Sequence, residues 1–253
     1  MENLSPQIIQ RYSRQTVYEK IGLENQKKLF NAHAVIIGLG ALGSVIANNL
    51  CRAGVGRLRL VDQDYVDISN LPRQVLFDED DAAAKRPKAE ATFNHLSKIN
   101  SATALEPVIT HVDSANIEEL IKDADIVMDG SDNMEVRFVI NSACHKLKIP
   151  WVFGGVLGGG GNSMTIIPGE SPCLRCFLPE LPPPGSFPTC ADAGVLNMAS
   201  NIIASVESAE AIKILTGSPA VNRKVFVLDI WNNTAEYLEL SKDPYCPVCG
   251  REK

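Results

Sequence analysis

Residues 33–43, HAVIIGLGALG, decide the fold of this chain of 253 residues. The apolar run HAVII (33–37) has the composition of a buried strand and leads directly into the pattern G-x-G-x-x-G, formed by Gly38, Gly40 and Gly43. Between a strand and a helix, such glycines allow a tight turn and a close approach of phosphate, and the helix N-terminus supplies N–H donors and a positive dipole end. The segment therefore predicts a nucleotide-binding turn.

An acidic residue on the next strand supports this prediction. Asp62 ends the apolar run RLRLVD (57–62), 19 residues after Gly43. At this position a carboxylate accepts hydrogen bonds from ribose hydroxyls. The turn and the acid leave the identity of the nucleotide open.

Short apolar runs alternate with helical segments through the first 156 residues. Further strands are expected at ALEPVI (104–109), DIVMD (125–129) and WVFGGV (151–156), and helices at 41–53, 86–99, 116–122 and 133–147. This alternation predicts an α/β, Rossmann-like fold with a mostly parallel sheet and helices on both faces. A helical arm outside the sheet is expected over residues 1–30.

The composition changes after Trp151. The glycine-rich run GGVLGGGGN (154–162) is expected to lead into a strand at SMTIIP (163–168). Five prolines then follow within ten residues, which predicts a stiff, exposed crossover loop over 177–190.

The C-terminal part predicts one long helix and a hairpin. A helix over 199–216 is expected to end at Gly217 and to turn one apolar face inward, formed by Ile202, Val206, Ala209, Ile212 and Leu215. The last apolar segment predicts an antiparallel extension of the sheet that turns at Asn232 and Asn233. Since no repeat or long linker interrupts the sequence, one domain is expected over 1–253, with a nucleotide-binding half (31–157) and a second half (158–253).

Composition and charge exclude several function classes. The net charge of −6 argues against general nucleic-acid binding through the whole surface. The longest apolar run, 34–47, is shorter than the roughly 18 residues of a membrane span. The N-terminus MENLSPQIIQRYSR has no apolar segment of the secretory type. We therefore expect a cytoplasmic protein.

The seven cysteines predict a metal site. Four of them form two C-x-x-C pairs, and in a reducing compartment such pairs favour metal binding over disulfides. The pairs lie about 70 residues apart, so a tetrahedral zinc site forms only if the C-terminal tail folds back; redox dithiols are the alternative. Of the other three, Cys51 and Cys144 have helical spacing and are expected in the core, which leaves Cys190.

The charged residues favour a triphosphate over a dinucleotide. Cations lie in or beside short polar motifs, and two carboxylates follow a strand: Arg14, Arg73, Lys85, Arg86, Lys88, Asp129 and Asp132. This combination suits ATP with Mg²⁺. A dehydrogenase that binds NAD(P) would leave most of these charges without a role, and solvated surface charges are the simplest alternative for each one alone.

Motifs along nearly the whole chain carry a family resemblance. They are RYSRQ (11–15), GLGALG (38–43), VDQDYVDISNLPRQ (61–74), KRPKAEA (85–91), DGSDNMEVRFVIN (129–141), CLRC (173–176), CADAGV (190–195), EAIKILTG (210–217) and CPVC (246–249). In this order they make the chain similar to the MoeB/ThiF/HesA family, the bacterial relatives of ubiquitin-activating enzymes.

The resemblance implies an adenylation reaction. Such enzymes join the C-terminal Gly-Gly carboxylate of a small ubiquitin-like β-grasp protein, a sulfur carrier, to AMP from ATP and release pyrophosphate. It implies a homodimer, Mg²⁺ and Zn²⁺, a carrier-binding half over 158–253, and in some relatives a sulfur donor. A peptide or small-molecule carboxylate remains an alternative substrate, and a non-catalytic scaffold is a third hypothesis.

The resemblance also implies residue roles. Asp62, with Asp64 nearby, would bind the ribose; Asp132 would hold Mg²⁺; and Arg14 would reach the triphosphate from the other subunit. The phosphates would be held by Asn70, Arg73 and Lys88, with Gln74 in the same nucleotide-binding motif. The four zinc ligands would be Cys173, Cys176, Cys246 and Cys249, and Cys190 would act in sulfur transfer or thioester chemistry, or simply begin a helix.

Two segments depart from the family pattern. The family usually has a glycine shortly before Pro-Lys, where this chain has Lys85-Arg86-Pro87-Lys88. Relatives in the MoeB branch carry proline and glycines where this chain has LNMASNIIASVES (196–208). The appended domains of eukaryotic activators have no counterpart in this sequence, so a complete ubiquitin-type relay is not expected.

Overall fold

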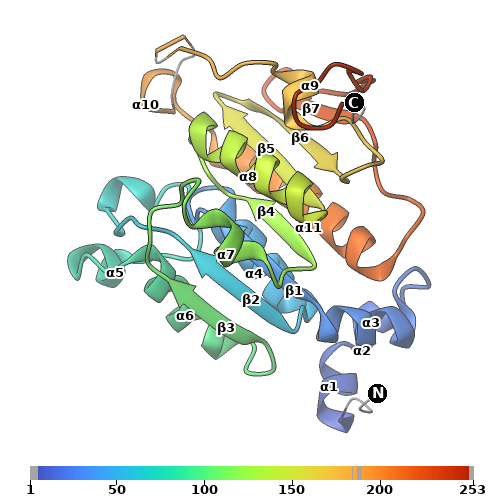
Figure 1. Ribbon diagram of the computed structural model, residues 1–253. Coiled ribbons are helices and arrows are strands. Elements are labelled where there is room, and N and C mark those ends of the chain that lie inside the picture. Colours follow the sequence, from blue (N-terminus) through green and yellow to red (C-terminus); the bar gives the residue numbers. More distant parts are fainter. Residues whose placement is uncertain (1–4, 184, 187–189, 251–253) are drawn as a thin grey trace.

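The computed structural model describes residues 5–183, 185–186 and 190–250, except the side chains of residues 190 and 191. One sheet of eight strands runs through these residues in the order β3-β2-β1-β4-β5-β6-β7-β8 (Figure 1). The first five strands are parallel: β1 (His33–Ile37), β2 (Arg57–Val61), β3 (Ala104–Val108), β4 (Ile126–Asp129) and β5 (Trp151–Leu157). The last three are antiparallel: β6 (Gly160–Ile166), β7 (Val225–Asp229) and β8 (Thr234–Leu238).

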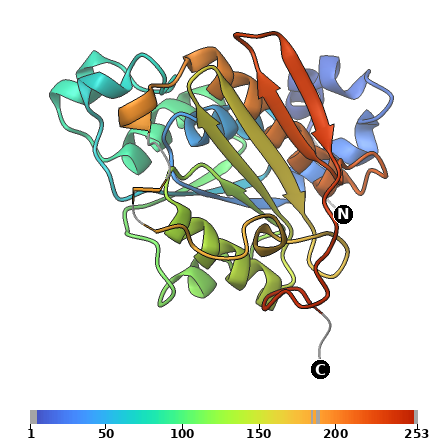
Figure 2. The same cartoon turned by 90° about the horizontal axis from the view of Figure 1, so that it is seen from above.

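Helices cover both faces of the parallel part (Figure 2). One face packs against α4 (Gly43–Ala53), α6 (Lys88–Ile99) and α11 (Asn197–Thr216), and the other against α7 (Ile117–Ile121) and α8 (Met134–Leu147). The parallel strands contribute side chains to the hydrophobic clusters on both faces of the sheet. In β1, Ala34 and Ile36 belong to the cluster under α4, α6 and α11, and Val35 and Ile37 belong to the cluster under α7 and α8. The predicted fold class is confirmed.

The shorter elements lie around this framework. The N-terminal arm consists of α1 (Pro6–Arg11), α2 (Ser13–Thr16) and α3 (Gly22–Asn31), outside the sheet as predicted. The remaining turns and helices are η1 (Ile68–Asn70), α5 (Glu79–Ala83), α9 (Leu174–Phe177) and α10 (Cys190–Ala193). Cys51 and Cys144 are fully buried, as expected for core residues.

The strand expected at SMTIIP (163–168) is present but begins earlier than predicted, and the glycine-rich run lies almost entirely within two strands. β5 extends to Leu157, and β6 already begins at Gly160. A Cβ at Gly161 would lie 2.6 Å from the carbonyl oxygen of Gly155 and 2.7 Å from Ile203 of α11. Glycine is therefore selected here by close packing of a strand beneath a helix.

The inward face of α11 also differs from the prediction. The buried face is formed mostly by small residues, together with Ile203, Glu207 and Glu210. Of the expected set, Ala209 is exposed, and Ile202, Val206, Ile212 and Leu215 are only half-buried. Because α11 lies close against α4 and the β5–β6 hairpin, small side chains pack beneath it and larger ones lie at its sides.

Lys85 explains one departure from the family pattern. Its φ of 44° is left-handed, and it directly follows the last residue of the α5 turn. The Arg86 N–H donates to the carbonyl oxygen of Asp81 (3.0 Å), which closes the helix end in the way that usually selects glycine. Lys85 therefore keeps the backbone path of a glycine at a conformational cost.

We predict that Lys85→Gly raises the free energy of unfolding by about 0.5–1 kcal/mol. Glycine removes a left-handed penalty of roughly 1–2 kcal/mol and loses part of that gain in chain entropy. Chemical denaturation measures the change. The matched control, Lys85→Ala, removes the same charge but keeps the penalty, so an equal gain in both variants would contradict this explanation.

Candidate nucleotide and substrate site

The glycine turn lies where strand order reverses, between the carboxyl ends of β1 and β4. Gly38 has a φ of 85°, and a Cβ on it would lie 2.7 Å from the carbonyl carbon of Gly130. Gly43 begins α4, where a Cβ would collide with the carbonyl oxygen of Gly38. The glycine turn and the loop at Gly130 are therefore in direct backbone contact. The N-terminus of α4 faces the cavity beside them.

Asp62 holds this turn with both carboxylate oxygens. One accepts from the N–H of Leu39 and the other from the N–H of Asp64, each at 2.7 Å. Burial raises the pKa of Asp62, and the charge of Lys88 opposes that shift. Lys88 is almost fully buried at the start of α6 and pairs with Asp64 at 3.0 Å. A cation therefore lies beside the acid expected to bind ribose.

A small cavity brings most of the predicted nucleotide residues together. It is lined by Gly38, Gly40, Asp62, Asp64, Lys88 and Asp132, with Val112 and Val136 as apolar walls. Thr110 and His111 also line it, and His111 Nδ1 lies 3.1 Å from Gln63 Oε1. Sequence reasoning missed these two because they follow a strand without a recognisable motif.

A larger groove of about 1000 Å³ opens beside this cavity. The two share residues 130–133, so the Asp132 carboxylate lies where they meet. The groove has a floor of glycines from β5 and β6 and a wall that includes Phe177, Leu181, Pro182 and Pro183 of the predicted crossover loop.

The three predicted site residues at the end of the motif at 61–74 do not all line the groove. Arg73 and the buried Gln74 line the groove, and no partner is found for Gln74 Oε1. Asn70 lines neither cavity: its Oδ1 accepts from the N–H of Asp67 (3.1 Å) and closes a capping box around η1. Within one chain, Asn70 therefore shapes the loop that carries Arg73 and Gln74.

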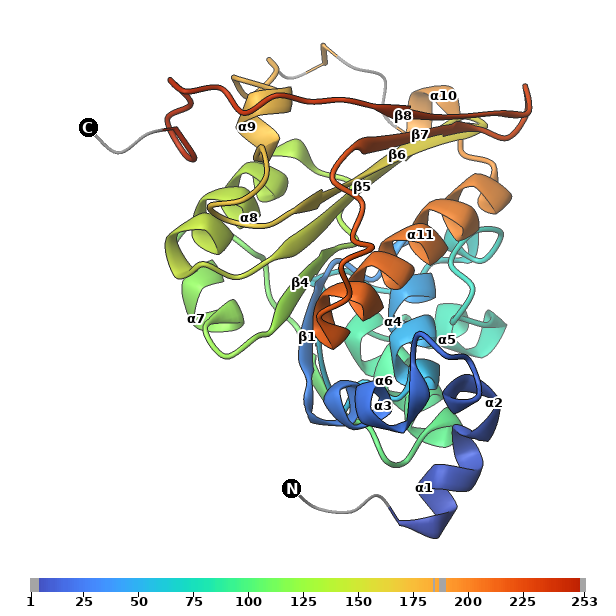
Figure 3. The same ribbon diagram turned by 90° about the vertical axis from the view of Figure 1, so that its right-hand side faces the viewer.

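Arg14 does not reach this site within one chain. It is exposed on α2, and its neighbour Gln15 donates to the carbonyl oxygen of Ala53 (2.8 Å) at the far end of α4. The glycine turn lies at the opposite end of that helix. Figure 3 shows the N-terminal arm (α1, α2 and α3) and α10 at opposite ends of the molecule.

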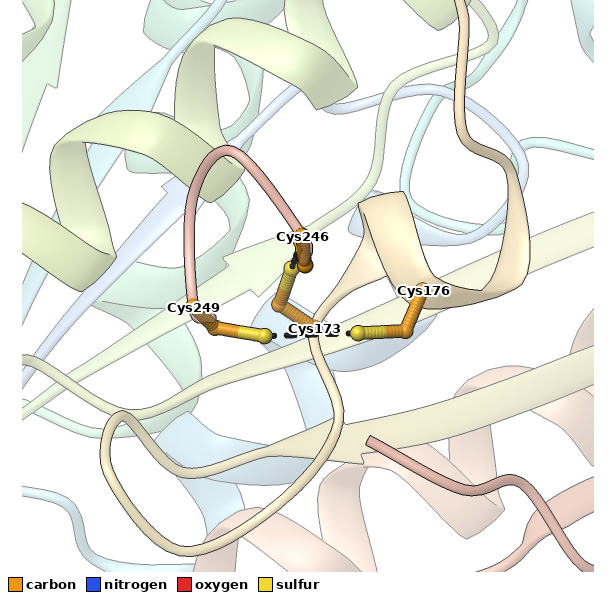
Figure 4. Close-up of side chains that lie close together, drawn as sticks. All are labelled: Cys173, Cys176, Cys246 and Cys249. Atoms are coloured by element: carbon orange, nitrogen blue, oxygen red, sulfur yellow. Dashed lines mark hydrogen bonds between the residues drawn. The ribbon is translucent and has the colours of Figure 1, made fainter. Parts of the chain in front are cut away.

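Four cysteines converge as the sequence predicted (Figure 4). Their Sγ atoms all lie within 4.8 Å of one another: Cys173, Cys176, Cys246 and Cys249. Two short Sγ–Sγ contacts each join a cysteine of the first pair to one of the second, at 3.6 Å for 173–246 and 3.3 Å for 176–249. The N–H of Asp243 also donates to Cys176 Sγ (3.4 Å). This set of four buried or half-buried thiols fits a tetrahedral metal ion better than two separate dithiols.

Comparison with known proteins places this site in a family. A model of the ThiF family matches residues 12–248. The chain belongs to the ThiF family. It is 42% identical over 242 residues to the sulfur carrier protein ThiS adenylyltransferase of Bacillus subtilis, an alignment that covers 95% of this chain and 71% of that protein.

Other members extend this likeness. The SAMP-activating enzyme E1 of Haloferax volcanii is 36% identical over 243 residues, which cover 96% of this chain and 89% of that protein. The crystal structure of Escherichia coli MccB with ATP superposes with a TM-score of 0.81 at 25% identity, covering 95% of this chain and 74% of MccB. The expected family and the adenylyltransferase class of enzyme are confirmed.

The side chain of Cys190 lies outside the described residues. Its backbone begins α10, as one of the two hypotheses for CADAGV expected. Within the described residues, no helix is long and apolar enough to cross a membrane.

A buried ionic cluster under the groove escaped the sequence analysis. Arg137 pairs with Asp129 (2.9 Å) and donates through Nη2 to the carbonyl oxygens of Ser131 and Gly154, both at 2.7 Å. As the fourth residue of α8, its side chain points back toward the helix start and the end of β4. The signal in the sequence that could have identified this cluster is the spacing within the motif at 129–141, where Arg137 follows the strand-ending Asp129 by about two helical turns.

Glu207 of α11 completes the cluster. It is fully buried over Gly154, and no partner is found for either oxygen. Burial and the neighbouring Asp129 raise the pKa of Glu207 well above its usual range. Burial therefore favours the neutral form of Glu207, and Asp129 is the acid that pairs with Arg137.

We predict that Glu207→Gln gains stability over the wild type as pH rises. The unfolded chain releases the Glu207 proton near pH 4.5, whereas the folded protein retains it, so wild-type stability falls above that pH. The glutamine variant does not ionise. Its melting temperature should therefore rise by a few degrees relative to the wild type between pH 5 and pH 8. Glu236→Gln, on exposed β8, is the control; an offset that stays constant with pH would refute a buried neutral acid.

Proposed function

We propose that this chain is an ATP- and Mg²⁺-dependent adenylyltransferase. It activates the C-terminal Gly-Gly carboxylate of a ubiquitin-like sulfur-carrier protein as an acyl-adenylate and releases pyrophosphate. The observation that carries the proposal is the junction at residues 130–133, where a cavity with nucleotide-binding residues meets a glycine-floored groove. The names of the relatives in Bacillus subtilis and Haloferax volcanii support the carrier as substrate.

The residues around the junction divide the chemistry between them. Asp62 orients the ribose, the start of α4 faces the phosphates, and Lys88 and Arg73 stabilise negative charge as pyrophosphate leaves. The Asp132 carboxylate, exposed at the junction, would hold Mg²⁺, and the ion would supply positive charge that neutralises the phosphates. Asp129 cannot take this role because Arg137 and Ser131 occupy its oxygens.

No protein nucleophile is needed for this step. The substrate carboxylate itself attacks the α-phosphorus, a P–O bond forms, and the bond to pyrophosphate breaks. Catalysis then rests on placing the two reactants in line and on electrostatic stabilisation. Cys190 would act only after the adenylate exists, in sulfur transfer with a donor protein.

A homodimer completes the proposed site. Arg14 lies at the end of α4 opposite to the glycine turn, so its guanidinium contributes to catalysis only in a second subunit. A two-fold dimer would give each active site one arginine from the partner.

Zinc is proposed as a structural clamp. Four cysteine ligands leave no open position for catalysis, and they join the tail at 246–249 to the start of the crossover loop at 173–176. A reducing cytoplasm suits these thiols.

A peptide carboxylate is the second candidate substrate. The observation that favours it is the likeness to MccB, whose crystal structure with MccA-N7isoASN has a TM-score of 0.83. Pyrophosphate exchange driven by a short peptide but not by a Gly-Gly carrier would select this alternative.

The main prediction concerns Asp132. Asp132→Ala should reduce carrier-dependent ATP–pyrophosphate exchange by at least about 100-fold, because charge stabilisation at the leaving phosphates is lost. Glu90→Ala, which removes an exposed carboxylate from α6, is the control and should retain full exchange. Activity within a few-fold of wild type in Asp132→Ala would remove this residue from the mechanism.

The same assay tests the dimer through subunit mixing. Arg14→Ala and Asp132→Ala should each be nearly inactive, whereas co-expression of the two should restore about one quarter of wild-type exchange. Half of the dimers are then mixed, and each mixed dimer has one intact site. If the mixture stays inactive while Arg14→Ala alone is impaired, Arg14 acts in another way.

Zinc makes a separate prediction. Protein purified without chelator should contain about one zinc per chain by elemental analysis, and Cys246→Ser should lose it together with several degrees of melting temperature. Cys51→Ala should keep its zinc because Cys51 lies in the other core cluster. Well under one zinc per wild-type chain would count against the site.

A further inference from the structure

The floor of the groove contains a notch above Gly155. Gly155 of β5 pairs with Asn162 of β6. A Cβ on Gly155 would lie 3.3 Å from Asn162 Oδ1, 3.8 Å from the ring of Phe153 and 3.9 Å from Arg137 Nη1. All four residues line the groove. The glycine therefore leaves space with an acceptor on one side and a cation on the other.

The acceptor has no partner within the described chain. Asn162 Oδ1 is buried from solvent, and no hydrogen bond to it is found. A buried acceptor without a donor is costly, and native proteins seldom retain one without a reason. An oxygen in this state at the floor of a groove is satisfied when a bound molecule brings an N–H.

The donor beside the notch, Arg137 Nη1, has only a weak hydrogen-bond partner. Arg137 uses Nε and Nη2 on Asp129 and two carbonyl oxygens, as described above, but the partner found for Nη1 is the sulfur of Met134 (3.3 Å). Sulfur is a weak acceptor, and Nη1 carries two hydrogens. Arg137 therefore retains donor capacity toward the notch.

We propose that this notch binds the last peptide unit of the substrate. Asn162 Oδ1 accepts a hydrogen bond from the final backbone N–H, and Arg137 Nη1 faces the oxygen atoms that follow it. This inference rests on the proposed function and makes it more specific. It requires a substrate whose last residue is joined through a secondary amide, and it excludes small carboxylic acids without such an amide and chains whose last nitrogen carries no hydrogen.

Two variants probe the notch with little risk to the fold. Asn162→Ala removes the acceptor. Gly155→Ala fills the notch, and its φ is not left-handed and its Cβ meets no backbone atom, in contrast to the clash at Gly161. Circular dichroism and an unchanged KM for ATP would verify that both variants fold.

The experiment compares two fluorescein-labelled ten-residue peptides by anisotropy, with a non-hydrolysable ATP analogue present. One peptide ends in Gly-Gly and the other in Gly-sarcosine, where a methyl group replaces the last amide hydrogen. In the wild type, N-methylation should weaken binding about tenfold, which corresponds to one lost hydrogen bond. Asn162→Ala should weaken the Gly-Gly peptide by a similar factor and show almost no further loss with sarcosine. Gly155→Ala should weaken the Gly-Gly peptide as well.

Several outcomes overturn the inference. These are an equal sarcosine penalty in wild type and Asn162→Ala, wild-type affinity in Asn162→Ala, or no binding of the Gly-Gly peptide to the wild type. A third peptide, ending in Gly-Ala, keeps the N–H and controls for bulk; if it loses as much as sarcosine in both proteins, bulk explains the effect. Failure of the proposed function is separate: the peptide binds as expected, but a Gly-Gly carrier drives no pyrophosphate exchange.

Discussion

The backbone contact between Gly38 and Gly130 constrains everything built at the ends of β1 and β4. No side chain fits between these two loops, since a Cβ on Gly38 would meet the carbonyl group of Gly130 and the N–H of Ser131 within 2.8 Å. The contact fixes the glycine turn against the loop that carries Asp132. It also sets the start of α8, two residues after Asp132, and through α8 the position of Arg137. The glycine turn and Asp132 are thereby held in fixed positions relative to each other.

The same arrangement determines which charged side chains lie under the groove. Arg137 bonds to the carbonyl oxygens of Ser131 and Gly154, so one guanidinium joins the nucleotide side to the groove floor. Its charge is paired with Asp129, while burial and the charge of Asp129 raise the pKa of Glu207. Desolvation therefore favours the neutral form of Glu207 beside this ion pair, which limits the negative charge under the groove floor.

Local pattern was enough to predict the parallel strands, the glycine turn and the cysteine pairs. Each depends on neighbours in the sequence: an apolar run before the glycines at 38–43, or two thiols three positions apart. What failed depends on distant partners. Gly161 lies in a strand that packs beneath Ile203, and Glu207 of α11 is buried where Gly154 leaves room for it. The distance between Arg14 and the nucleotide turn also follows only from the folded chain.

The sheet changes from parallel to antiparallel at β5, and the two cavities meet beside this change. The parallel half resembles a general nucleotide site, because helix starts and strand ends gather at one edge. In the antiparallel half, β6 pairs with β5 through glycines that carry no side chains, and this leaves an open groove floor. A dehydrogenase would need space there for a nicotinamide ring and hydride acceptor, whereas this floor offers glycine backbone, Asn162 Oδ1, for which no partner is found within the described residues, and the Arg137 guanidinium. The groove, more than the glycine turn, therefore distinguishes this chain from other proteins with the same turn.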